Sequence, residues 1–201
     1  LASTSGTSTS LSLEWSGSEG ANLYSVTNGS DTQTTTSNNI TFTGLTANTY
    51  YDIIVTSYND TIKGGLSILD NLITAPLAPS DPYVSGLTGS GLTLTWSGAS
   101  GATKYQIIAD DSQNQTVYET NDTFYNFTGL QPATTYDFTI TSYNGDNLVG
   151  ESVTLENVFT SPSAVTDLTD TGITETTISL SWTGADGANK YYVTDGNDTQ
   201  T

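Results

Sequence analysis

The sequence has no cysteine, histidine or arginine, and these absences restrict what the protein can do. Without cysteine the chain has neither disulfides nor thiolate metal ligands. Without histidine it lacks the commonest general base and the commonest zinc ligand. No metal-ligand cluster is spelled out, and no glycine-rich phosphate loop opens a helix. We therefore expect no enzymatic activity, no catalytic residues, no metal site and no cofactor.

Positive charge is also scarce, because 21 acidic residues stand against three lysines and give a formal net charge of −18. Phosphate binding needs a basic patch, so we expect no nucleic-acid partner. Anionic membrane surfaces are disfavoured for the same reason. No apolar run of about 18 residues is present, so we expect no membrane insertion. No signal peptide is visible, so the signal of a secreted protein would lie outside this sequence.

Hydrophobic residues make up only 34% of the 201 residues, so each core must be small. Antiparallel sheets tolerate this composition because one face of each strand can be exposed to water. Three segments alternate apolar and polar residues and then reach a tryptophan and a glycine: Leu11–Gly17, Leu92–Gly98 and Ile178–Gly184. Their tryptophans are 81 and 86 residues apart. Such a long period with strand-type alternation predicts tandem β-domains of under ~100 residues each.

Other strand-like segments follow each tryptophan, and no helical period of useful length occurs. In the first repeat we expect strands over 23–27, 40–42, 51–55 and 66–73. In the second we expect them over 105–108, 116–119, 125–127, 136–140 and 153–159, and in the third over 191–194. Proline-containing stretches at Pro76–Pro82 and around Pro162 suit stiff linkers. We therefore predict an all-β fold with sandwiches at 1–76 and 77–162 and an incomplete third unit at 163–201.

The repeats resemble fibronectin type III domains. A tyrosine stands nine residues after each tryptophan, as in Trp15 and Tyr24. The segments Leu45–Tyr51 and Leu130–Tyr136 resemble the family's tyrosine corner, in which a tyrosine hydroxyl bonds back to the preceding connection. The resemblance implies a seven-stranded, two-sheet, immunoglobulin-like sandwich in each repeat. It implies a spacer or binding module and no chemistry.

The third unit lacks the last three strands that this resemblance implies. Two explanations remain open: the 201 residues are part of a longer repeat array, or a neighbouring chain supplies the missing strands by strand addition. Either explanation makes further repeats, or copies of this chain, the expected protein partners.

Seven Asn-x-Ser/Thr sequons suggest covalent N-linked glycans, which require a secretory route and exposed asparagine side chains. Their positions fall in expected turns and strand ends or on a water-facing strand side, so none is predicted to be buried. The sequon asparagines are Asn28, Asn39, Asn59, Asn114, Asn121, Asn126 and Asn197.

The remaining candidate residues have structural interpretations that we prefer. Acidic residues near Asp110–Asp111 and Asp167 could bind Ca²⁺, but they lack the spacing of a calcium-binding loop. We interpret them as residues of solvent-exposed turns. Tyr58 and Tyr143 could form a contact surface, but they could also cover neighbouring strands. The predicted core anchors are Trp15, Trp96, Trp182, Tyr51 and Tyr136.

These inferences favour a structural segment of an extracellular or cell-surface glycoprotein, such as a fibre, sheath or adhesive stalk. Two alternatives remain: an adhesin or receptor ectodomain that binds protein or carbohydrate, and a spacer in a secreted carbohydrate-active enzyme.

Overall fold

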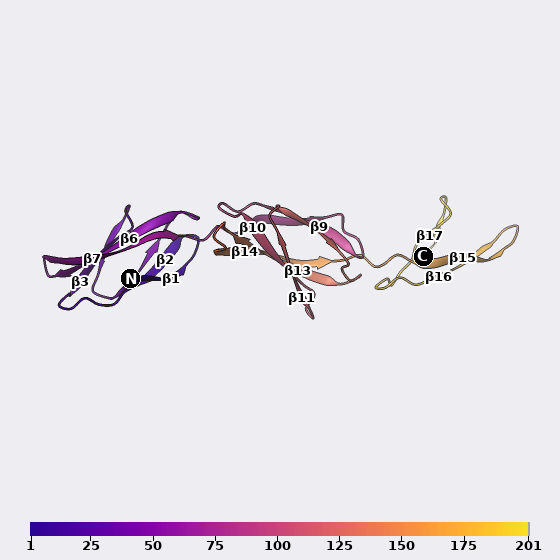
Figure 1. Cartoon of the computed structure of the whole chain (residues 1–201). Coiled ribbons are helices and arrows are strands. Elements are labelled where there is room, and N and C mark those ends of the chain that lie inside the picture. Colours follow the sequence, from indigo (N-terminus) through magenta and orange to yellow (C-terminus); the bar gives the residue numbers. More distant parts are fainter. Residues whose placement is uncertain (201) are drawn as a thin grey trace. The chain divides into compact units, whose positions relative to one another are not determined.

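The protein is described by a computed structural model that covers residues 1–200, and these residues form strands, turns and loops without a helix (Figure 1). The all-β prediction is therefore confirmed. No described segment is a helix capable of crossing a membrane. The chain divides into two compact units. The first comprises residues 1–80, 97–106 and 140–153, and the second comprises 81–96, 107–139 and 154 onward.

Seven strands precede residue 80. They are β1 (Ala2–Gly6), β2 (Ser10–Glu14), β3 (Leu23–Thr27), β4 (Thr32–Thr35), β5 (Asn39–Thr43), β6 (Tyr50–Asn59) and β7 (Ile62–Ile73). They form a three-stranded sheet in the order β1-β2-β5 and a four-stranded sheet in the order β4-β3-β6-β7. All the neighbouring strands in both sheets are antiparallel.

The core of this part lies between the two sheets and follows the predicted alternation. Leu13 on β2 and Phe42 on β5 pack with Val26, Ile53 and Val55 from the four-stranded sheet. Each of these side chains alternates with a more exposed neighbour on its strand. The sequence alternation therefore selects the side of each strand that faces the opposite sheet.

The following strands are β8 (Ser80–Ser85), β9 (Gly91–Ser97), β10 (Lys104–Asp110), β11 (Gln115–Thr120), β12 (Phe124–Thr128), β13 (Thr135–Tyr143) and β14 (Val149–Phe159). Their sheet orders are β12-β9-β8 and β11-β10-β13-β14. Aromatic rings connect the sheets: Phe127 on β12 lies 4.9 Å from Tyr118 on β11 and 4.8 Å from Phe138 on β13, measured between ring centroids. This core is more aromatic than that of the first sandwich.

The last described strands are β15 (Thr166–Ile173), β16 (Ile178–Thr183), β17 (Val193–Thr194) and β18 (Thr199–Gln200). They form two separate two-stranded sheets, β15-β16 and β17-β18. Every residue of β15 is exposed, and in β16 only Trp182 is partly buried. The alternating apolar side chains of this region therefore lack the cover that the earlier repeats have.

The observed strands depart from the expected ones at several places, of which three are informative. The polar strand β4 carries no apolar alternation and is held by pairing to β3. Strand β7 begins at Ile62, four residues before the expected start, because its pairing with β6 continues past Gly64 and Gly65 to Lys63 and Ile62. Strand β17 has two residues, where the pattern predicted four.

Candidate functional site

Trp15 and Trp182 each lie beside the tyrosine that stands nine residues further along the chain. The rings of Trp15 and Tyr24 are 5.4 Å apart in an edge-to-face arrangement, and those of Trp182 and Tyr191 are 5.6 Å apart in a similar one. Trp96 is buried, whereas Trp15 and Trp182 are half-buried. This geometry fits a packing role for each tryptophan.

The two tyrosines of the predicted corners also have structural partners. The Tyr51 hydroxyl accepts a hydrogen bond from the backbone N–H of Thr46 at 2.9 Å, and Tyr136 accepts one from Gln131 at 3.0 Å. Gly44 precedes the first corner with a φ of 71°, a left-handed conformation that glycine adopts without strain. These hydroxyls fix a loop, and they are not aimed at a binding surface.

The sequon asparagines differ in accessibility, and one prediction about them is wrong. Asn28 is only 7% exposed, because it lies under the turn between β3 and β4. Its side-chain oxygen accepts hydrogen bonds from the N–H groups of Ser30 and Asp31. The asparagines whose side chains are exposed are Asn39, Asn59, Asn114, Asn121, Asn126 and Asn197. Glycosylation at these six positions stays a prediction.

The turn that holds Asn28 recurs with aspartate in the later repeats. Asp111 accepts hydrogen bonds from the backbone N–H groups of Asn114 and Gln113. Asp195 accepts the same pair of bonds from Asp198 and Asn197. The bonds to Asn114 and then Gln113 lower the pKa of the Asp111 carboxyl, and those to Asp198 and then Asn197 lower the pKa of Asp195. These hydrogen bonds stabilise the ionised carboxylate, and the carboxylate in return holds the backbone of the turn.

The acidic clusters do not converge into a metal site within the described residues. No group of three or more potential ligand residues is close enough together there to hold an ion. Asp110 instead accepts bonds from the Ser112 N–H and the Gln115 side chain. Asp167 accepts a bond from the Thr183 hydroxyl at 2.8 Å.

Tyr58 on β6 and Tyr143 on β13 are both half-buried. The ammonium group of Lys104 lies 5.0 Å from the centre of the Tyr143 ring. Tyr58 lies opposite Leu23 in the pairing of β6 with β3. Both tyrosines thus cover neighbouring strands.

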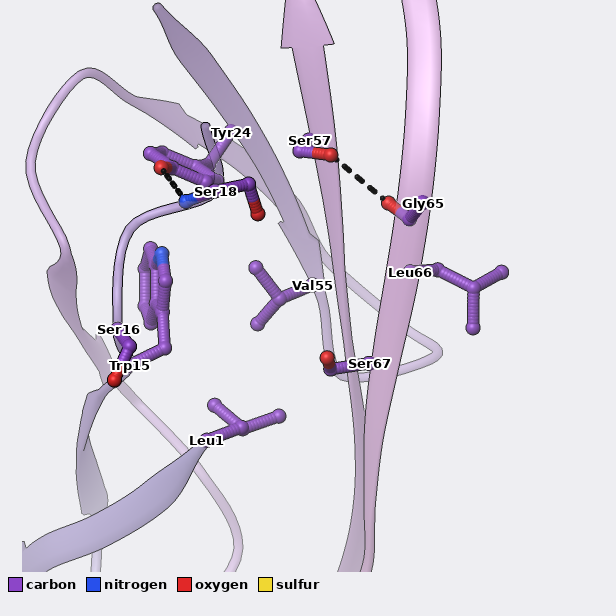
Figure 2. A pocket seen from close by; sticks show the side chains of 10 residues that line it. All are labelled: Leu1, Trp15, Ser16, Ser18, Tyr24, Val55, Ser57, Gly65, Leu66 and Ser67. Atoms are coloured by element: carbon purple, nitrogen blue, oxygen red, sulfur yellow. Dashed lines mark hydrogen bonds between the residues drawn. The ribbon is translucent and has the colours of Figure 1, made fainter. Parts of the chain in front are cut away.

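A cavity of about 270 Å³ opens beside Trp15 in the first unit (Figure 2). Trp15 and Tyr24 line one side, and Ser57 on β6 and Ser67 on β7 line the other. The full lining consists of Leu1, Trp15, Ser16, Ser18, Tyr24, Val55, Ser57, Gly65, Leu66 and Ser67. The pattern of the sequence did not indicate this cavity, because its existence depends on how closely the two sheets approach each other.

The polar groups around the cavity either form hydrogen bonds within the chain or have an equivalent in another repeat. Tyr24 accepts a hydrogen bond from the Ser18 N–H, and the Ser57 hydroxyl donates to the Gly65 carbonyl. The indole N–H of Trp15 is buried without an acceptor among the described residues, but that of Trp96 is too. An indole N–H without an acceptor therefore recurs at this position of the fold, and it does not mark the cavity as a ligand site. The side chains of the lining include no carboxylate, amine or imidazole, so they offer no acid–base pair.

Part of the chain matches the model of a known family. The model of the fibronectin type III domain matches residues 77–158. Endoglucanase B of Cellulomonas fimi is 30% identical over 164 residues, which cover 69% of this chain and 16% of that protein. Receptor-type tyrosine-protein phosphatase eta of Mus musculus is 31% identical over 149 residues, which cover 74% of this chain and 12% of that protein.

A human protein and a solved structure show the same kind of similarity. Fibronectin type III domain-containing protein 7 of Homo sapiens is 28% identical over 164 residues, covering 80% of this chain and 22% of that protein. A structure of two fibronectin type III domains from chicken tenascin has a TM-score of 0.47 and 19% identity, and the match covers 78% of this chain and 97% of that one. This chain therefore spans less than a quarter of the length of these three curated relatives.

Proposed function

The chain carries a fibronectin type III domain at residues 77–158, and from this premise we propose that it is a structural segment of an extracellular, glycosylated fibre, sheath or adhesive stalk. The observation that carries the proposal is the recurrence of one packing unit. The same strand, with its tryptophan and a tyrosine nine residues further on, occurs three times in the sequence. In the first and third occurrences the two rings pack against each other, and Tyr136 holds a backbone N–H in the second repeat. A chain that repeats a scaffold without a catalytic constellation suits a mechanical or spacing role.

The surface supports an extracellular location. Six sequon asparagines have exposed side chains, so a glycosyltransferase could reach them without unfolding the chain. Three lysines and no arginine leave few cleavage sites for trypsin-like proteases. Glycans and acidic side chains would keep such a segment hydrated and soluble.

The proposed partners are further repeats or copies of the same chain. The last described region supports this proposal, because Leu168, Ile173 and Ile178 are each more than 60% exposed. In a strand-addition arrangement, strands from a neighbouring repeat or chain would cover these side chains.

Expression in a eukaryotic secretory host tests this proposal. Intact mass and glycopeptide analysis should find glycans on several of the six exposed sequons and none on Asn28. Electron microscopy of the purified chain should show polymers or extended arrays. A secreted product without added mass, together with a natural chain that stays monomeric, would overturn the glycosylated-fibre proposal.

The similarity to Endoglucanase B and to the receptor phosphatase favours two alternative contexts. In the first the chain is a spacer or carbohydrate-binding module of a carbohydrate-active enzyme, and in the second it belongs to an adhesin or receptor ectodomain. The full reading frame separates them, because the first predicts a neighbouring catalytic domain and the second a transmembrane segment. Sedimentation with insoluble cellulose is a direct test of carbohydrate binding by the chain itself.

A further inference from the structure

Strand β7 is an edge strand with an unused side. It is twelve residues long and has β6 as its neighbour at the end of the sheet β4-β3-β6-β7 (Figure 1). An edge strand presents backbone N–H and C=O groups that can pair with another chain. Between two irregularities in its pairing with β6, the segment Leu66–Leu69 forms a regular ladder opposite Ile53–Thr56.

The side chains of this regular segment have two different orientations. Leu66 and Ile68 are each more than half exposed and lie opposite Thr56 and Ile54 on the outer face of the sheet. Figure 2 shows Leu66 pointing away from the cavity, while Ser67 points toward it. The outer side of β7 is therefore apolar at its centre.

Opposite charges flank this apolar centre. Lys63 precedes it and Asp70 follows it, and both side chains are exposed. Neither forms an ion pair with another side chain in the part of the chain that the structure describes. Along one strand, seven residues correspond to about 23 Å, so the two charges cannot reach each other within one copy.

We propose that β7 is a contact surface for a second copy of this chain, in an antiparallel β7–β7 pair with Ser67 opposite Ser67. In this register Leu66 of each copy faces Ile68 of the other, on the same side of the joined sheet. Lys63 of each copy then falls within one residue position of Asp70 of the other, at both ends of the contact. The strand is self-complementary in shape and in charge, as a two-fold contact requires.

The equivalent edge strand of the next repeat lacks this complementarity. Strand β14 carries Glu151 and Glu156 and has no lysine. An antiparallel pair of two β14 strands would bring like charges together, which disfavours it. The contrast makes β7 the edge that fits a second copy. The inference deepens the proposed structural role, because it names a contact by which copies could associate.

Sedimentation velocity at increasing protein concentration tests the contact, with the full chain produced in a host without N-glycosylation. We expect reversible dimerisation by the wild type. The variants Lys63→Asp and Asp70→Lys should each raise the dissociation constant by about tenfold, because each replaces two attractions with two repulsions. The double variant should restore dimerisation, because it exchanges the charges and keeps them complementary.

Glu156→Lys on β14 is the matched control, because it changes the net charge by the same amount as Asp70→Lys. If only the lower net negative charge mattered, repulsion between copies would fall and association would strengthen in both variants. The proposed contact instead predicts that Asp70→Lys weakens it while Glu156→Lys does not. Unchanged thermal unfolding of each variant shows that folding is intact.

Cysteine cross-linking tests the register directly, since the chain has no other cysteine. Ser67→Cys should yield a disulfide-linked dimer under mild oxidation, and Ser152→Cys on β14 should not. A wild-type chain that stays monomeric at all concentrations, or a dimer insensitive to both charge variants, would overturn the contact. Either result leaves the proposed structural role to its own tests, glycan mass and imaging of the natural chain.

Discussion

Strands β9 and β16 have the same sequence pattern and different surroundings. Leu92 and Leu94 on β9 are 3% and 0% exposed, whereas the equivalent Ile178 and Leu180 on β16 are 68% and 41% exposed. Strand β9 lies between β12 and β8, and β16 is paired with β15 in the described chain. The comparison teaches that alternation selects the apolar side of a strand, while burial also requires an opposing sheet.

One feature is the same in the covered and the uncovered repeat. The Trp182–Tyr191 pair keeps nearly the separation of the Trp15–Tyr24 pair, 5.6 Å against 5.4 Å. Tyr191 also accepts a hydrogen bond from the Ala185 N–H at 3.0 Å, as Tyr105 does from Ala99. The turn after the tryptophan is therefore a local element that forms without the full sandwich.

The largest expected difference between the two strands follows from removing an apolar side chain. Leu94→Ala should lower the free energy of unfolding by about 2–5 kcal/mol, because it leaves a cavity in a packed core. Leu180→Ala should change it by less than about 0.5 kcal/mol, because the side chain is already exposed. Scanning calorimetry of the two variants measures both effects. Equal destabilisation would mean that β16 is as well covered as β9.

A smaller difference is expected from removing one hydroxyl. Tyr105→Phe leaves the Ala99 N–H without its acceptor beside a buried ring, and should cost about 1 kcal/mol. Tyr191→Phe should cost less than about 0.5 kcal/mol, because water can replace the hydroxyl of a half-buried ring. Chemical denaturation of the two variants gives the comparison. A larger loss of unfolding free energy for Tyr191→Phe than for Tyr105→Phe would contradict the claim that the third repeat has only a local turn and no packed core.

The smallest effect concerns a feature that should not differ between the repeats. Backbone hydrogen bonds lower the pKa of Asp111 and of Asp195 in the folded chain. Because the folded pKa lies below the unfolded one, the stabilisation is present above the unfolded pKa and is lost as pH falls through the folded pKa. Carboxyl NMR titration should find both pKa values below the usual aspartate range.

The control for this titration is the removal of the charge. Asp111→Asn and Asp195→Asn should each make their turn insensitive to acid, as Asn28 makes the equivalent turn of the first repeat. An unshifted pKa at Asp195 alone would show that the third turn needs the opposing sheet after all.

Local alternation made much of the fold predictable. The strand Leu23–Thr27 was predicted with the bounds that the structure has, because its apolar residues alternate and a turn follows. Strand β4 was missed, because its polar residues carry no such signal and its pairing to β3 creates it. Strand β7 begins four residues before the expected start, and it passes through Gly64 and Gly65 with an irregular register in its pairing with β6.

The candidate site was less predictable than the fold. Asn28 was expected to be exposed because sequons and turns are usually at the surface, but its side chain bonds inward to the turn backbone. The cavity beside Trp15 arises from the spacing between the sheets, which no local pattern encodes. The self-complementary charges of β7 were visible in the sequence only once the strand was known to be an edge.

The central claim is that the apolar side of an alternating strand is buried only when a second sheet lies opposite it. Amide hydrogen exchange on the dilute, full-length chain tests this claim most directly. The account predicts that the amides of Leu92–Trp96 exchange only through unfolding of their domain, with strong protection. It predicts that those of Ile178–Trp182 exchange orders of magnitude faster, through local opening. Equal protection of the two strands at low protein concentration would contradict it.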